Sequence, residues 1–180
     1  MSLLGNLSIH EEMKRGNIYS SNGILDLDGM GIDVHLDHHF YFMKMPSKTV
    51  NIVWNNPEDM FEYVYCQSAV VLPPTSITLA TTVEIVGSRS KDIACLLNTR
   101  STLARFGISI HTGAIVSEPG FCNKWTLELI NNTTTEIEIP IHSRVGTVYF
   151  TRVEMNNTMY KGSYSEEWTP RTMLPKERNM

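Results

Sequence analysis

The feature that most constrains the fold is a period-two alternation of β-branched and aromatic residues, which recurs along most of the chain. Between Ile32 and Leu36, for example, apolar side chains alternate with Asp33 and His35. This alternation is typical of strands with one buried face. The same spacing recurs at 50–54, 77–85, 125–130, 137–141 and 148–152, and the segments 93–97 and 108–111 are expected to be further strands. Pro, Gly and Asn separate the runs and no internal repeat is visible, so the pattern predicts a mainly β barrel or sandwich.

A short helix is expected before the first strand. Ser8 followed by Glu11 matches a capping box, and Gly16 lies where a glycine commonly ends a helix. These signals predict a helix over Ile9–Arg15. The turn-rich segment Asn17–Gly31 that follows is predicted to be a loop.

A single helical turn is expected near residues 101–106. Thr99 or Ser101 can cap it, and Gly107 can close it. Such a turn presents free backbone N–H groups beside Arg100 and Arg105, which suits an anion. A purely structural turn that carries an arginine is the more common case, so the turn alone assigns no function.

Size and charge limit the kinds of protein that the chain can be. It has 180 residues, of which 42% are hydrophobic and 19% charged, so residues 1–159 are expected to form a single β domain. Residues 160–180 mix Tyr, Gly, Ser, Pro and charge without a period, and we expect a tail ordered over the active site or a neighbouring subunit. The net charge of -4 argues against a nucleic-acid partner.

The same composition predicts a cytoplasmic protein. No apolar run approaches the roughly 20 residues that a membrane span requires. The first residues lack a basic start followed by an apolar stretch, which argues against secretion. Cys66, Cys95 and Cys122 are odd in number and far apart, which is typical of reduced thiols.

A cluster of polar residues at 33–39 raises the hypothesis of a metal site. It contains His35, His38 and His39 together with Asp33 and Asp37. In a continuous strand, His38 would point away from the other four side chains, and no second cluster supplies ligands from another segment. The pattern therefore favours a polar strand face and no metal. The H-x-E and P-C-x-x-C signature of zinc nucleobase deaminases is also absent.

Glu128 is a candidate general base. The alternation places Trp125, Leu127 and Leu129 on one side of a strand, and Glu128 with Thr126 on the other. An enclosed carboxylate there would have a pKa raised toward a catalytic value. A solvent-facing glutamate is the more common case.

Several linked motifs resemble those of one enzyme family. Arg100–Gly107 resembles the R-S-S-L-A-R-x-G signature of dCTP deaminases. In unbroken spacing, His111–Ala114, Glu118–Phe121 and Thr126–Leu129 resemble the family's H-x-x-A, D-P-G-[WF] and x-L-E-[LF] segments. Earlier segments, Gly31–Leu36, Val71–Pro74 and Leu79–Glu84, resemble further family stretches.

The resemblance implies a dUTPase-like fold, a distorted β-barrel or jelly roll, assembled as a homotrimer with three active sites between subunits. It implies hydrolytic deamination of dCTP to dUTP and ammonia without zinc. Glu128 would activate the water, and Ser101 and Arg105 would hold the water and the carboxylate in line.

The resemblance also assigns residues to the substrate. Arg100, Ser101 and Thr102 would bind phosphate oxygens, with Mg²⁺ held mainly by the triphosphate and water. The carbonyl of Ala114 would accept from the exocyclic amine of cytosine. The remaining substrate-binding positions are Glu118, Thr126, Tyr160 and Tyr164. His111 and Thr112 match a segment that is linked in relatives to feedback by dTTP.

Three departures from the family pattern keep alternatives open. Glu118 stands where the family has an Asp that contacts the sugar and where dUTPases hold a water-activating Asp. Ser163 and Glu167 stand where the family's tail has Lys and Gln for the phosphates. The alternatives are a dUTPase-like pyrophosphatase, alone or combined with deamination, and a non-catalytic nucleotide-binding protein on the same fold.

Overall fold

A computed structural model describes residues 2–23, 27–44, 56–154, 158–162, 164–165 and 167–175. The strand predicted from Val50, Ile52 and Trp54 lies outside these residues, as does Ser163.

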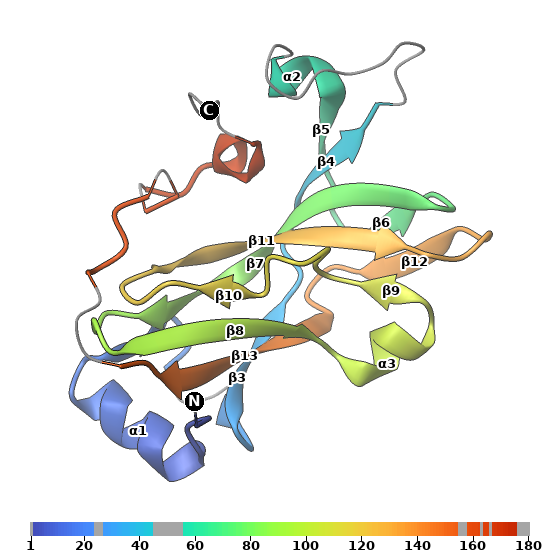
Figure 1. Ribbon diagram of the computed structural model, residues 1–180. Coiled ribbons are helices and arrows are strands. Elements are labelled where there is room, and N and C mark those ends of the chain that lie inside the picture. The colour runs from blue at the N-terminus through green and yellow to red at the C-terminus, as the bar shows by residue number, and fades with distance from the viewer. Residues whose placement is uncertain are drawn as a thin grey trace.

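The described strands form two larger sheets and one small one (Figure 1). The six-stranded sheet contains β1 (Ile18–Ser20), β4 (His39–Met43), β5 (Phe61–Tyr65), β7 (Ser76–Ser88), β9 (Ile108–Ser109) and β11 (Cys122–Asn131). The five-stranded sheet contains β2 (Leu27–Asp28), β3 (Gly31–His35), β8 (Ile93–Thr99), β10 (Val116–Ser117) and β13 (Arg144–Arg152). A third, two-stranded sheet pairs β6 (Ala69–Leu72) with β12 (Ile137–Pro140). The pairings in the three sheets are antiparallel, and the mainly β fold predicted from the alternation is confirmed.

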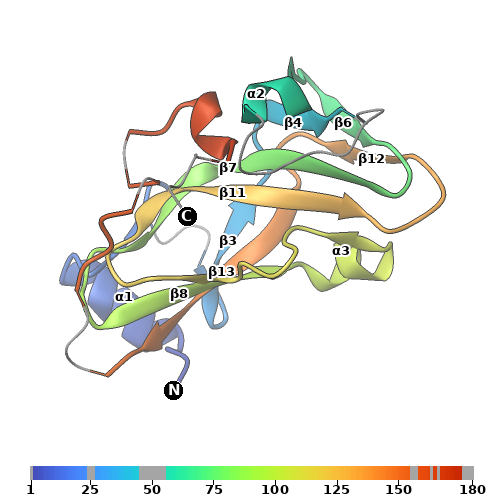
Figure 2. The same ribbon diagram turned by 45° about the horizontal axis from the view of Figure 1, so that its top comes forward.

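The two larger sheets pack face to face and enclose one core (Figure 2). Leu127 and Leu129 of β11 and Phe40 of β4 point inward from one sheet. Val148 and Phe150 of β13 meet them from the other. On β11 and β13 the inward face is the one that the alternation predicted, because period two separates the two faces of a strand. On β7 the prediction is wrong: Ala80 and Val86 enter the core from the opposite face, and Ile77, Val83 and Ile85 are only half-buried.

The pairing of β7 with β11 contains an irregularity that shapes the site. Lys124 faces Ile85, but Thr126, two residues on, faces Thr81, four residues back. Buried hydroxyls of β7 bond the displaced backbone: Trp125 N–H donates to Thr82 Oγ1 at 3.0 Å, and Thr81 Oγ1 donates to the Trp125 carbonyl at 3.1 Å. The interrupted ladder is therefore satisfied by side chains, as buried backbone groups require.

The N-terminal helix is longer than predicted. Helix α1 spans Asn6–Lys14 and begins after Gly5, with no side chain capping it, so the predicted Ser8–Glu11 capping box is wrong. Gly16 does end the helical segment, with a positive φ of 76° that a side-chain-free residue adopts readily. The helix has no side-chain cap, so the packing of Ile9 in the core holds it in place.

Two further local predictions need correction. The segment Asn17–Gly31 is not only a loop, because β1 and β2 lie within it and pair with β7 and β3. The helical turn is confirmed as α3 (Ser101–Arg105), but its N-cap is Arg100, with no side-chain cap from either Thr99 or Ser101. The strand predicted to reach His111 ends at Ser109.

The described part of the tail packs against its own chain. The 3₁₀ helix η1 (Pro170–Met173) in the tail contacts β4 and β7. Strand β4 also pairs with β5, which follows the short helix α2 (Pro57–Met60). Leu174 is buried with Phe61 and Leu79. Just before η1, the Trp168 ring lies 5.2 Å from the His39 ring and 4.5 Å from Lys124 Nζ.

The three cysteines are free thiols, and burial raises the pKa of Cys95 to about 12. The described part of the chain contains no helix that is long and apolar enough to span a membrane.

A buried carboxylate joins α1 to the end of β13. Glu12 is only 2% exposed and accepts hydrogen bonds from Arg15, Asn17 and Arg152, each at 2.6–2.7 Å. Mainly through the Asn17 bond, these donors hold the pKa of Glu12 below its ordinary value despite its burial. A depressed folded-state pKa means that the stabilisation is present above the ordinary pKa and is lost as pH falls through the folded one.

We predict that Glu12→Gln lowers the free energy of unfolding at pH 7 by about 1–3 kcal/mol, because charged hydrogen bonds become neutral ones. The difference from the wild type should shrink below about pH 4.3, where the unfolded-state carboxyl is itself protonated. Urea unfolding at pH 7 and at acid pH measures it. The control is Glu11→Gln, since Glu11 is exposed and lies 4.0 Å from Arg15. Equal losses in both variants would contradict the role of Glu12.

We predict that Trp168→Ala loosens the tail, because it removes the ring contacts with His39 and Lys124. Amide exchange at 164–174 should accelerate by about tenfold, while exchange in β7 and β11 stays unchanged. Hydrogen-exchange mass spectrometry measures both. Glu167→Ala, at the exposed neighbouring position, is the matched control. Unchanged tail protection in the tryptophan variant would show that these contacts do not hold the tail.

Candidate functional site

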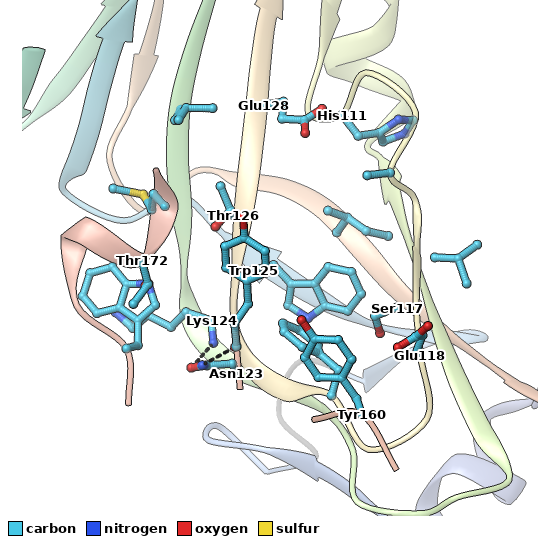
Figure 3. A pocket seen from close by; sticks show the side chains of 18 of the residues that line it. His111, Ser117, Glu118, Asn123, Lys124, Trp125, Thr126, Glu128, Tyr160 and Thr172 are labelled. Atoms are coloured by element: carbon cyan, nitrogen blue, oxygen red, sulfur yellow. Dashed lines mark hydrogen bonds between the residues drawn. The ribbon is translucent and has the colours of Figure 1, made fainter. Parts of the chain in front are cut away.

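A cavity of about 620 Å³ lies between β11, the segment 111–121 and the tail. Glu128 and His111 lie at one end of it, and Tyr160 and Glu118 at the other (Figure 3). Strand β11 supplies one wall, because Thr126 and Glu128 occupy the face that points away from the core. The tail supplies another, through Trp168 and Thr172 among others.

Glu128 is half-buried on this wall, on the side of β11 that the alternation predicted. Its Oε2 accepts the backbone N–H of Thr112 at 2.7 Å and also the Thr112 hydroxyl. Among the described residues, no hydrogen bond reaches Oε1. The carboxylate therefore has one fixed oxygen and one that is available to a molecule in the cavity.

Most of the predicted site residues come together around this cavity. The residues that line it include Glu128, His111, Ala114, Glu118, Thr126, Tyr160 and Tyr164. Thr112 joins them through its bonds to Glu128. They come from separate segments of the chain, and the antiparallel pairing of β11 with β9 brings two of these segments side by side.

The predicted residues of α3 lie elsewhere in the same chain. Ser101, Thr102 and Arg105 are exposed, Arg100 is half-exposed, and none of the four is among the described residues that line the cavity. The neighbouring Phe106 is 63% exposed. Helix α3 follows β8 at the far end of the sheet from the tail (Figure 1). Within one chain, the expected contact of Glu128 with Ser101 and Arg105 is therefore not formed.

Lys124 and Trp168 line the cavity but were not predicted. Lys124 Nζ lies 2.5 Å from Asp37 Oδ2 and below the Trp168 ring. Burial alone would raise the pKa of Asp37, but hydrogen bonds from Lys124 and the His38 backbone hold that pKa below its ordinary value. Asp37 therefore stays ionised at neutral pH. A lysine within an alternating strand was the one sequence signal for a buried charge at position 124. Its partner could not be identified from the sequence, because Asp37 lies 87 residues away.

The tail approaches the cavity closely at one glycine. Tyr160 N–H donates to the Pro119 carbonyl at 2.7 Å. A Cβ on Gly120 would lie 3.0 Å from the Tyr160 nitrogen, and Gly120 has a φ of 93°. A side chain at this position would be strained by the positive φ and would crowd Tyr160, so glycine allows the tail to pack closely against the Glu118–Phe121 turn.

The polar residues at 33–39 do not converge on one point. Asp33 pairs with Arg144, His35 with Glu84, His38 with the Cys66 carbonyl and His39 with the Tyr63 hydroxyl. The strand ends at His35 and a new one begins at His39, so the continuous strand on which the sequence argument was conditional is not formed. Across the described residues, no three His, Cys, Asp or Glu side chains are grouped so that they could hold a metal ion.

Comparisons with known proteins identify the family of the chain. A family model described as dCTP deaminase-like matches residues 3–153. A protein of Dictyoglomus turgidum named "dCTP deaminase, dUMP-forming" is 29% identical over 122 residues, which cover 66% of this chain and 62% of that protein. A dCTP deaminase of Pyrobaculum calidifontis is 36% identical over 95 residues, covering 53% of this chain and 52% of that one. The chain thus spans less than two thirds of the length of these relatives.

The fold is shared with a solved structure. The crystal structure of 2′-deoxycytidine 5′-triphosphate deaminase from Agrobacterium tumefaciens superimposes with a TM-score of 0.62 at 16% sequence identity. The match covers 84% of this chain and 46% of that one. Because the family model spans most of the chain, including the Arg100–Gly107 and Thr126–Leu129 motifs, the protein belongs to the dCTP deaminase-like family.

Proposed function

We propose that the protein catalyses the hydrolytic deamination of dCTP. The observation that carries this function is the position of Glu128, whose carboxylate lies on the wall of a cavity large enough for a nucleotide and has one oxygen without a hydrogen-bond partner among the described residues. The cavity also has aromatic walls, including Phe121 and Tyr160, that suit a base and a sugar.

The chemistry requires a carboxylate that takes a proton and returns it. Glu128 would remove a proton from water as the water oxygen bonds to C4 of cytosine. It would then deliver the proton to N3 or to the departing amine, so that the C4–N bond breaks, ammonia leaves and a uracil nucleotide remains. Acid–base catalysis of this kind contributes about 10²–10⁴-fold. The carbonyl of Ala114, at the same wall, would accept from the exocyclic amine of cytosine.

The missing half of the site would come from a neighbouring subunit. Arg100, Ser101 and Arg105 project from an exposed helix together with the exposed Phe106, which suits a surface covered by another copy. In a closed homotrimer, each copy would place its α3 against the Glu128 cavity of the next. Ser101 and Arg105 would then hold the water and the carboxylate, and Arg100 and Thr102 the phosphates.

The nucleotide would carry its own metal ion. The donor sets of the described residues do not fit a protein-held metal, so a Mg²⁺ ion would be coordinated by phosphate oxygens and water. No catalytic step is assigned to it. The free thiols suit a reducing compartment, which we take to be the cytoplasm.

A second candidate function is deamination combined with release of diphosphate. The name of the Dictyoglomus relative, which specifies dUMP as product, favours it. Glu118 lies on the cavity wall and is exposed, so a second carboxylate is present where a water could be activated. Deamination alone is favoured by the longer side chain of Glu118 in place of the Asp of dUTPases. Control by dTTP through His111 and Thr112 remains a prediction from family resemblance.

We predict that Glu128→Gln lowers the rate of ammonia release from dCTP by at least about 10²-fold, because an amide cannot accept the proton of the water and return it. Binding of dCTP should change little, since the side-chain shape is kept. Ammonia and diphosphate are measured in the same reaction, with dCTP and dUTP as separate substrates, so the two candidate functions are distinguished. The matched control is Glu138→Gln on the exposed face of β12. Full activity in Glu128→Gln would overturn the mechanism.

We predict that two inactive variants restore each other. Glu128→Gln and Ser101→Ala damage opposite walls of the proposed intersubunit site. After equal amounts are unfolded and refolded together, about a quarter of the interfaces should combine two intact walls and recover activity. Sedimentation velocity checks that the particle is a trimer. A mass of one chain, or no recovery on mixing, would contradict the shared site.

A further inference from the structure

Thr112 binds Glu128 through two donors at once. Its backbone N–H and its hydroxyl both donate to Oε2, and no hydrogen bond from the described residues reaches Oε1. The sequence resemblance linked Thr112 only with feedback by a nucleotide. Its hydroxyl nevertheless contacts the carboxylate that would do the chemistry.

The backbone around this contact is fixed on both sides. Glu128 N–H donates to the Ile110 carbonyl at 2.9 Å, and Ile110 is fully buried. The Ser109 hydroxyl donates to the His111 carbonyl at 2.7 Å, which shapes the chain as it leaves β9. Thr112 is therefore presented to Glu128 by a segment that is itself bonded to the same strand.

We propose that Thr112 is a positioning residue, which holds Oε2 of Glu128 and leaves Oε1 as the oxygen that receives the proton of the water. Two bonds to one oxygen restrict rotation of the carboxylate about its terminal torsion, which is otherwise broad for glutamate. Orientation of a reacting group is a large part of catalysis in enclosed sites. This role presupposes that the protein deaminates dCTP.

Substitutions at Thr112 separate the hydroxyl from the shape of the side chain. Thr112→Val removes the hydroxyl but keeps the β-branched shape and the backbone N–H. Thr112→Ser keeps the hydroxyl and removes a methyl group. Thr112 is exposed in the chain, so neither substitution leaves a cavity in the core. We expect kcat for dCTP to fall about tenfold in Thr112→Val, with KM within twofold, because one charge-assisted hydrogen bond is lost while the backbone bond remains. Thr112→Ser should retain kcat within about threefold.

Three kinetic outcomes overturn the positioning role: an unchanged kcat in Thr112→Val, an equal loss of kcat in both variants, or a rise in KM alone. A wild-type protein that releases no ammonia from dCTP overturns the deaminase function itself, and with it this role. The second measurement needs no activity. Urea unfolding of Thr112→Val, Glu128→Ala and the double variant yields the coupling between the two side chains. Coupling beyond the error of the cycle supports the contact, and additive effects overturn it.

Discussion

The irregular pairing of β7 with β11 is the constraint on which the site depends. A regular ladder would continue from Lys124 opposite Ile85 to Thr126 opposite Val83, but Thr126 instead faces Thr81. The fully buried Thr81 and Thr82 take up the unmatched backbone of Trp125 with their hydroxyls. Without those bonds, buried N–H and C=O groups would be left unsatisfied, at a cost of about 1–3 kcal/mol each. The displaced register brings Asp37 beside Lys124, since Asp37 N–H bonds to the Thr81 carbonyl at 3.0 Å.

The chain builds the walls of the cavity from β11, the segment 111–121 and the tail, and places α3 away from them. Strand β11, the segment 111–121 and the tail are held by backbone hydrogen bonds and buried side chains within one molecule. Helix α3 has no buried residue and no side-chain cap, yet it carries the arginines and hydroxyls of the family motif. Residues kept in an exposed short helix are of little use to the stability of the monomer. Their placement makes sense if assembly and activity are linked, so that a site is completed only when a second copy covers the first.

The sequence was informative where one physical rule dominates and uninformative where distant residues decide. Period two identified the buried faces of β11 and β13, because burial of one face of a strand imposes that period. It failed on β7, where Ala80 and Val86 enter the core and Leu79 of the predicted face packs against Leu174 of the tail. The cap at Ser8 failed because core packing of Ile9 sets the position of α1. The family motifs located Glu128 and Glu118 at one cavity. They could not reveal Lys124 with Asp37 or Trp168, because those contacts depend on the β7–β11 register and on the path of the tail.

The charges of the residues that line the cavity also bear on how the proposed substrate would be held. Glu118 and Glu128 both face the cavity, and Lys124 is the only lysine or arginine among the described residues that line it. That lysine is paired with Asp37, whose lowered pKa keeps it ionised, so the pair adds no net positive charge. A triphosphate entering this cavity would meet two carboxylates without a compensating cation, which is unfavourable at the low effective dielectric of a partly buried site. Arg100 and Arg105, to which we assign the phosphates and the catalytic carboxylate, are not among the described residues that line this cavity. The charges of the lining residues therefore favour the proposal that the phosphates bind where two copies meet.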